Sequence, residues 1–232
     1  MRTWETKSGS RILRILSGRS NVFLITDGKK NILIDTSPEN KWNKLESKLT
    51  DLNINHIDYL ILTHTHFDHA TNSNRIKEKY NAKVIVHETE AWYLTTGKNI
   101  IPNGTNIITR TLINLFANSV LRRLGYEPCQ PDILVKSSLD LKEFGFNAYI
   151  IHTPGHTIGS MSIVVDNEVA LVGDTMFGIF KWSVFPPYVN DVKQMVKSWG
   201  ILLDTNRSVF IPSHGSANSR SLVQNDYDKR IY

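Results

Sequence analysis

Three histidines and one aspartate lie within six consecutive residues of this chain, His64-Thr-His-Phe-Asp-His69. They directly follow residues 59–63, an apolar run that predicts a buried strand. Because alternate residues of an extended segment point to the same side, we expect His64 and His66 to project together, with Asp68 and His69 facing a second point. Without a cation this group would be costly to pack, since the histidines would crowd and the carboxylate would need partners. The segment therefore predicts a metal site.

The composition limits the kind of metal site. The 232 residues include one cysteine, Cys129, which excludes an internal disulfide framework and every Cys-rich zinc module. A metal must then be held by imidazole and carboxylate, which suit zinc, iron or manganese. Hydrophobic residues make up 41% and charged residues 21% of the chain, which excludes collagen-like, coiled-coil and disordered classes.

The charge and the first residues bear on partners and location. The formal net charge of +5 is a mild excess, and no basic run with interleaved aromatic residues indicates nucleic-acid binding. Residues 1–7 carry charges where a signal peptide needs an apolar core, and the uncharged residues 111–121 are too few to span a bilayer. We therefore expect a cytoplasmic protein that acts on a small molecule, without nucleic acid and without stable membrane insertion.

Strand and helix patterns alternate before and after the histidine-rich segment. Apolar leucines and a tryptophan recur at helical spacing from residue 38 onward. A short helix is expected at 75–80. The β-rich runs that predict strands are residues 12–17, 22–26, 31–35 and 83–86.

A second set of elements follows late in the chain. Strands are predicted at residues 148–152, 160–165, 168–172 and 209–212, and a helix at residues 191–203. The order strand, strand, helix, strand, helix thus occurs twice, and two packed sheets with helices outside would bury these runs. Residues 92–138 do not fit the alternation. Their apolar side chains at helical spacing predict an inserted helical segment: Ile108, Leu112, Leu115, Phe116, Val120 and Leu124.

Three further polar residues follow apolar strands of the second half. They are His156 in Thr153-Pro-Gly-His-Thr-Ile-Gly-Ser160, Asp174 in Val172-Gly-Asp-Thr-Met-Phe177, and His214 in Ile211-Pro-Ser-His-Gly215. Each stands next to a glycine, where loops can converge without bulky neighbours. An isolated histidine at a strand end is more often solvated or packed in a core, but the histidine-rich segment makes these residues candidate ligands.

These four segments, in this order, resemble the metallo-β-lactamase superfamily. Residues 33–37, Leu-Ile-Asp-Thr-Ser, are also similar to that family's Asp-bearing strand end. The resemblance covers nearly the whole chain except residues 92–138. It implies a single domain over residues 1–232, of α/β class, built as a four-layer αββα sandwich of two mixed β-sheets flanked by helices.

The resemblance also implies a dinuclear metal site. By motif, His64, His66 and His156 would hold one divalent ion, Asp68, His69 and His214 would hold the other, and Asp174 would bridge them. Zinc is the expected metal, with iron or manganese as alternatives. A hydroxide shared by the two ions would attack an ester, lactone, thioester or phosphoester. Asp68 would orient it and carry a proton towards the leaving group, and Asp35 would anchor a ligand histidine or simply form a turn.

Other interpretations stay open at this point. An iron-dependent redox enzyme of the same fold would use similar ligands, and a non-catalytic member would only bind a ligand. Within the superfamily, a secreted β-lactamase, a glyoxalase II and a transfer-RNA nuclease are less favoured than a lactonase-like hydrolase. The segment 92–138 would cover the metal site as a lid, lie on a membrane surface or form the contact of a homodimer.

Overall fold

The computed structural model describes residues 1–99, 103–105, 108–109, 111, 115 and 125–231. The chain divides into two compact units. Unit 1 comprises Met1–Ile100 and Leu124–Lys136, and unit 2 comprises Ile101–Arg123 and Ser137–Tyr232. Each unit contains one mixed β-sheet with helices packed against it, which confirms the predicted α/β class with two mixed sheets flanked by helices.

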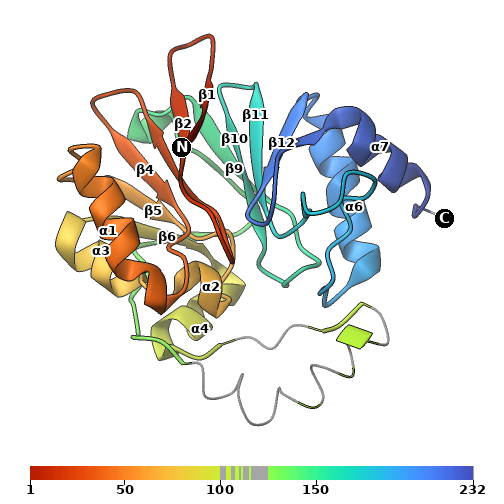
Figure 1. Cartoon of the computed structure of the whole chain (residues 1–232), viewed down its shortest axis with the longest axis horizontal. Helices are drawn as coiled ribbons and strands as arrows, with labels where there is room; N and C mark the ends of the chain where they lie inside the picture. Colours follow the sequence, from red (N-terminus) through yellow and green to blue (C-terminus); the bar gives the residue numbers. More distant parts are fainter. Residues whose placement is uncertain (100–102, 106–107, 110, 112–114, 116–124, 232) are drawn as a thin grey trace. The chain divides into compact units, whose positions relative to one another are not determined.

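Unit 1 is built on a seven-stranded sheet in which the strands follow chain order (Figure 1). The first four strands pair antiparallel, and β4 to β7 pair parallel. Parallel strands place their carboxyl ends at one edge, where connecting loops carry functional side chains. The strands are β1 (Arg2–Glu5), β2 (Arg11–Leu16), β3 (Val22–Thr26), β4 (Asn31–Ile34), β5 (Tyr59–Ile61), β6 (Lys83–His87) and β7 (Ile133–Val135).

The helices of unit 1 include α1 (Trp42–Asp51) and α3 (Ser73–Tyr80), which cover one face of the sheet (Figure 1). A 3₁₀ turn at Glu39–Lys41 precedes α1. Leu45 and Leu49 are fully buried on the apolar side of α1, and burial of each leucine contributes roughly 1.5–3 kcal/mol. The shorter helical pieces are α2 (Phe67–Ala70), a 3₁₀ turn at Glu88–Glu90 and α4 (Ala91–Thr96).

Unit 2 contains a six-stranded sheet in the order β13-β12-β11-β10-β9-β8. Its neighbouring strands pair antiparallel except for β11 and β12, which are parallel. Asp166 and Asn167 join β10 to β11 with φ of 51° and 55°, the left-handed conformation of a tight hairpin turn. The strands are β8 (Ser138–Asp140), β9 (Ala148–His152), β10 (Met161–Val165), β11 (Val169–Gly173), β12 (Val209–Pro212) and β13 (Asn218–Ser219).

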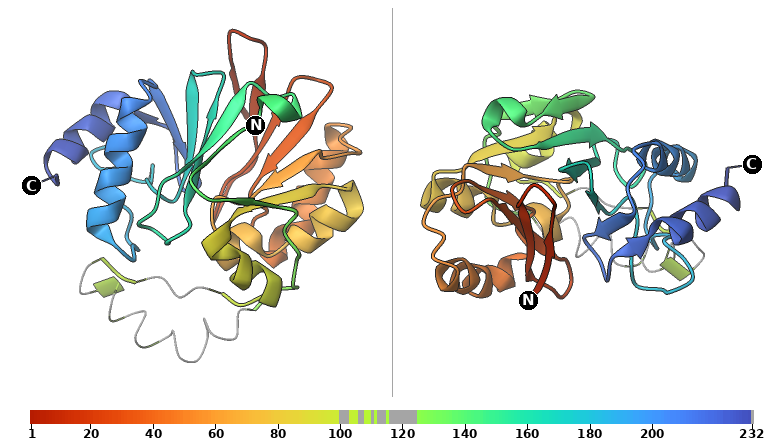
Figure 2. Two further views of the ribbon diagram at one scale, coloured as in Figure 1. Left: turned by 180° about the vertical axis from the view of Figure 1, so that it is seen from behind. Right: turned by 90° about the horizontal axis from the view of Figure 1, so that it is seen from above.

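Two helices of unit 2, α6 (Val192–Asp204) and α7 (Arg220–Asp228), pack against each other (Figure 2). Asp191 caps α6 by accepting a hydrogen bond from the Gln194 backbone N–H at 2.9 Å. Trp199, on the apolar side of α6, is fully buried, and its indole N–H donates to the Thr175 carbonyl at 2.6 Å. A further 3₁₀ turn lies at Lys142–Phe144.

The segment 92–138 differs in part from the expectation. It contains β7, which the sequence analysis did not predict and which extends the unit 1 sheet beside β6. Of the predicted apolar stripe, Leu112, Phe116, Val120 and Leu124 lie outside the described residues, so the helical insertion and the homodimer contact stay predictions. Among the described helices, none is both long enough and apolar enough to cross a membrane.

Candidate metal centre

The histidine-rich segment of unit 1 connects β5 to α2. His66 is extended, with φ −62° and ψ 150°, and the next residue begins α2, so the chain turns between His66 and Asp68. His64 and His69 are fully buried, and His66 and Asp68 are nearly so. The buried strand therefore ends by delivering three imidazoles and a carboxylate into one polar cluster.

The donor atoms of this half-site lie close together. His64 Nε2 lies 2.9 Å from His66 Nδ1, and the ring centroids of His64 and His69 are 4.1 Å apart. His69 Nε2 lies 3.8 Å from Asp68 Oδ1. We call His64, His66, Asp68 and His69 the unit 1 half-site.

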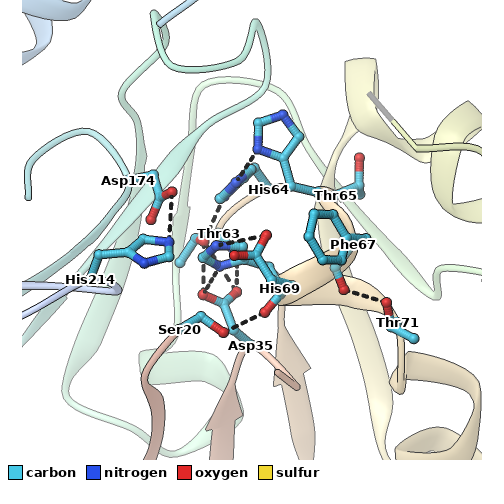
Figure 3. A network of polar contacts seen from close by, with 12 residues as sticks. Ser20, Asp35, Thr63, His64, Thr65, Phe67, His69, Thr71, Asp174 and His214 are labelled. Carbon is cyan, nitrogen blue, oxygen red and sulfur yellow. Dashed lines mark hydrogen bonds and ion pairs between the residues drawn. The ribbon is translucent and has the colours of Figure 1, made fainter. Parts of the chain in front are cut away.

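Asp35 lies at the end of β4 and holds two of the residues that follow β5 (Figure 3). Its carboxylate accepts hydrogen bonds from the Thr63 backbone N–H at 2.8 Å and the Thr63 hydroxyl at 2.9 Å. It also accepts from His69 Nδ1 at 2.8 Å. Asp35 has φ 60°, so it both turns the chain and orients a candidate ligand. The sequence analysis had treated these two roles as alternatives.

Several residues that support the same loop were not found from the sequence. Glu90 accepts hydrogen bonds from the backbone N–H and the hydroxyl of Thr65, and the Tyr126 hydroxyl donates to the Thr65 carbonyl at 3.1 Å. Ser20 donates its hydroxyl to the Asp68 carbonyl at 2.5 Å. Burial raises the pKa of Tyr126 above its ordinary value, so the phenol stays protonated as a donor. These side chains come from distant positions and form no recognisable motif.

The unit 2 half-site consists of His156, Asp174 and His214, which follow β9, β11 and β12. His156 Nε2 lies 3.5 Å from Asp174 Oδ2, and His214 Nε2 lies 3.2 Å from the same oxygen (Figure 3 shows the second contact). His156 Nδ1 donates to the Tyr188 carbonyl at 2.8 Å, which fixes the tautomer and leaves Nε2 as the basic nitrogen. His214 stacks on Phe177 with ring centroids 4.5 Å apart.

Glycines permit the close loop contacts of this half-site. Gly155, with φ 133°, lies so near α6 that a Cβ would meet the Met195 backbone N at 2.3 Å. Gly215, with φ 88°, lies against Gly178, where a Cβ would meet a carbonyl oxygen at 2.3 Å. Residues with a Cβ would push apart the loops that carry His156 and His214.

The comparisons with known proteins agree with these motifs. The family model of the metallo-β-lactamase superfamily matches residues 17–214. The chain belongs to this superfamily. A probable metallo-hydrolase of Methanocaldococcus jannaschii is 33% identical over 207 residues, which cover 87% of this chain and 90% of that protein. A hydroxyacylglutathione hydrolase of Pelagibacter ubique is 26% identical over 219 residues, or 94% of this chain and 76% of the other.

Solved metallo-β-lactamase structures share the fold. The B3 metallo-β-lactamase BLEG-1 superposes with a TM-score of 0.69 at 19% identity, over 93% of this chain and 96% of that one. A metallo-β-lactamase family protein of Thermus thermophilus gives 0.68 at 20% identity, over 97% and 78% of the two chains. This superfamily member therefore has a metallo-β-lactamase fold.

The imidazole nitrogens and carboxylate oxygens of the candidate ligands are spaced as a divalent cation requires. Two ligands of a tetrahedral zinc with bonds of about 2.1 Å lie about 3.4 Å apart. The contacts of Asp174 Oδ2 with His156 and His214, at 3.5 and 3.2 Å, match this spacing, and the 3.8 Å between Asp68 and His69 is close to it. The His and Asp groups of the chain are thus able to bind metal ions.

The remaining histidines of the superfamily member have structural partners. His87 Nε2 donates to the Lys136 carbonyl and His152 Nε2 to the Ile158 carbonyl, each at 2.8 Å. His56 is exposed, and its Nε2 lies 3.8 Å from Asp58 Oδ1.

Proposed function

We propose that the two half-sites together hold two divalent metal ions and that the protein hydrolyses an ester, lactone, thioester or phosphoester. The observation that carries the proposal is the pair of imidazole nitrogens beside Asp174 Oδ2, His156 Nε2 at 3.5 Å and His214 Nε2 at 3.2 Å. A divalent cation shared by these groups would satisfy the buried imidazole and carboxylate donors at this spacing. The match to a probable metallo-hydrolase supports the same reaction class.

The proposed assignment of ligands follows the family motifs. His64, His66 and His156 hold one ion, Asp68, His69 and His214 hold the other, and Asp174 contributes to both. Zinc suits this donor set, and iron and manganese are the alternatives. The ions would activate water near neutral pH and polarise the bond to be cleaved.

The chain's own residues set the protonation and orientation of the ligands. Asp35 holds the Nδ1 proton of His69, so that Nε2 presents its lone pair. The Tyr188 carbonyl does the same for His156. In this proposal Asp68 also carries a proton towards the leaving group.

The loop after β11 supports a substrate with an apolar group. Ile179, Phe180 and Trp182 are about half to three-quarters exposed, at 55%, 48% and 71%. The same loop contains Phe177, which stacks on His214, and the Gly178 N–H donates to the His214 carbonyl at 2.8 Å. A lactone or thioester with an acyl chain would bury these side chains, so the substrate proposed is lactonase-like.

The remaining parts of the proposal concern location and assembly. We place the protein in the cytoplasm, where the buried free thiol of Cys129 stays reduced. Its partner is a small-molecule substrate, and residues 92–138 are proposed as a homodimer contact. The alternative function is that of an iron-dependent redox enzyme. Such an enzyme would contain iron and consume oxygen, and it would not turn over an ester.

Elemental analysis followed by a substrate panel tests the function. The purified protein is expected to contain about two divalent ions per chain and to turn over a lactone, thioester or phosphodiester. His69→Ala should lose most of this activity and one ion while keeping its circular dichroism spectrum, and His152→Ala serves as the control. Full activity of His69→Ala, or a metal-free active protein, would refute the proposal.

A further inference from the structure

A groove in unit 1, of about 530 Å³, lies between the first two strands and α1. Arg2 of β1 and Arg14 of β2 line one side, and Lys44 and Lys48 of α1 line the other. Leu52 contributes apolar surface to the same groove. None of these residues belongs to the metal centre, so the groove needs its own explanation.

The two arginines occupy directly opposed positions. Arg2 pairs with Arg14 in the antiparallel β1–β2 ladder, so both side chains lie on one face of the sheet. Like charges directly opposite each other destabilise a sheet. Three positions further along the same ladder, Glu5 lies opposite Arg11, which is a pair of opposite charges. Arg2 also lies over the Trp4 ring, with its guanidinium carbon 5.0 Å from the ring centroid. An anion bound between the two guanidinium groups would offset the repulsion of the arginine pair.

The helix repeats the pattern on the other wall. Lys44 and Lys48 are one turn apart on α1 and share a side of the helix. Of the described residues that line the groove, Asp51 is the one acid, and it already contacts the Lys48 Nζ at 2.9 Å. Four cationic side chains and one carboxylate therefore line the groove, so these side chains carry a net formal charge of +3.

We propose that this groove binds a small polyanion with a phosphoanhydride group, such as pyrophosphate or a nucleoside polyphosphate. The volume lies within the range of small-molecule sites, roughly 300–1,000 Å³, and is too confined for a protein domain. Guanidinium groups bind phosphate oxygens through two parallel N–H bonds, and lysines add point charges. Two pairs of cations on opposite walls match two linked phosphates better than one.

Titration calorimetry on the purified full-length protein tests the site. The probes are inorganic pyrophosphate, ATP and orthophosphate at one fixed salt concentration, because charge attraction is screened by salt. Pyrophosphate is expected to bind at least about tenfold more tightly than orthophosphate, since charge-assisted hydrogen bonds are among the strong ones. ATP binding as tightly as pyrophosphate identifies the phosphoanhydride as the recognised group, and tighter ATP binding identifies a nucleotide ligand.

Matched variants locate the binding. Arg14→Gln should weaken pyrophosphate binding about tenfold or more, and Lys44→Gln, at an exposed helix position, should weaken it several-fold. The double variant Lys29→Gln/Lys30→Gln removes two charges from the turn after β3, outside the groove, and should bind as the wild type does. Lys44→Gln keeps the test valid if Arg14→Gln does not fold. Unchanged binding in Lys44→Gln and in folded Arg14→Gln, or equal affinity for orthophosphate, overturns the proposal.

Discussion

Asp35 accepts a hydrogen bond from His69 Nδ1 at 2.8 Å, and both side chains are fully buried. The contact joins the end of β4 to the loop after β5, two neighbouring parallel strands of unit 1. Asp35 also binds the backbone and hydroxyl of Thr63, one residue before the first histidine of the half-site. A single carboxylate therefore fixes both the path of the loop and the orientation of a candidate ligand.

Asp35→Asn is expected to weaken metal binding without removing a ligand. The amide keeps the shape of the side chain but loses the charge that favours a proton on His69 Nδ1. Loss of such a supporting contact typically costs 10–100-fold in metal affinity. Competition with a chromophoric chelator measures the affinity. Asp51→Asn, on the surface of α1, is the control, and an affinity equal to that control would show that Asp35 only shapes the turn.

Asp174→Ala is expected to abolish most hydrolysis while the fold persists. The substitution removes the oxygen that lies 3.5 Å from His156 Nε2 and 3.2 Å from His214 Nε2. Without it the two imidazoles lose their common anionic neighbour, and the second ion should be lost first. Turnover and metal content per chain are measured together, with circular dichroism as the check on folding. Retention of near wild-type turnover would contradict the proposed sharing of Asp174.

Asp226→Ala is expected to destabilise the protein by roughly 2–5 kcal/mol, because it leaves the Ser183 hydroxyl and the Val184 N–H without their acceptor and removes the partner of the partly exposed Arg230. The buried carboxylate accepts from the Ser183 hydroxyl and the Val184 N–H, each at 2.7 Å, and from Arg230 at 3.1 Å. It thereby ties the loop after β11 to α7. Urea denaturation measures the change.

The matched control for Asp226 stands two residues away on the same helix. Asp228 is exposed, and its carboxylate accepts a hydrogen bond from the Gln224 side-chain amide at 2.8 Å. Because this contact is open to solvent, Asp228→Ala should lower the free energy of unfolding by well under about 1 kcal/mol. Similar losses for the two variants would mean that Asp226 does not anchor the loop.

Much of the fold follows from local patterns in the sequence. The apolar runs at β3, β4, β10 and β11 are buried throughout or nearly so, and the periodic side chains of α1 and α6 face their sheets. The strands that were missed carry little such signal. β1 has the sequence Arg-Thr-Trp-Glu and is an edge strand with exposed side chains, so its pairing with β2 decides its conformation.

The candidate site was predicted to the extent that its residues form motifs. The histidine-rich segment is contiguous, and His156, Asp174 and His214 each follow a predicted strand. Glu90 and Tyr126 hold Thr65 from 25 and 61 residues away, and neither has a neighbour in the sequence that indicates this role. Such supporting contacts depend on tertiary structure, which a strand or helix pattern does not specify.

Asp132→Asn is expected to destabilise the protein at neutral pH but not in acid. Burial alone would raise the pKa of Asp132, but the Lys77 ammonium at 2.8 Å and the Val84 N–H at 2.7 Å donate to the carboxylate and lower its pKa overall. A lowered pKa means that ionised Asp132 stabilises the fold above the pKa of the unfolded chain, about 3.9, and that this contribution disappears as the pH falls through the folded value.

Urea unfolding at pH 7 and at successive values below pH 4 measures this difference for Asp132. The midpoints of wild type and Asp132→Asn should differ at pH 7 and converge as the pH falls, because both proteins then carry an uncharged side chain at this position. Lys77→Gln removes the cationic partner and should reduce the same pH dependence. A gap between wild type and Asp132→Asn that stays constant with pH would show that the substitution acts through packing, without a contribution from the charge.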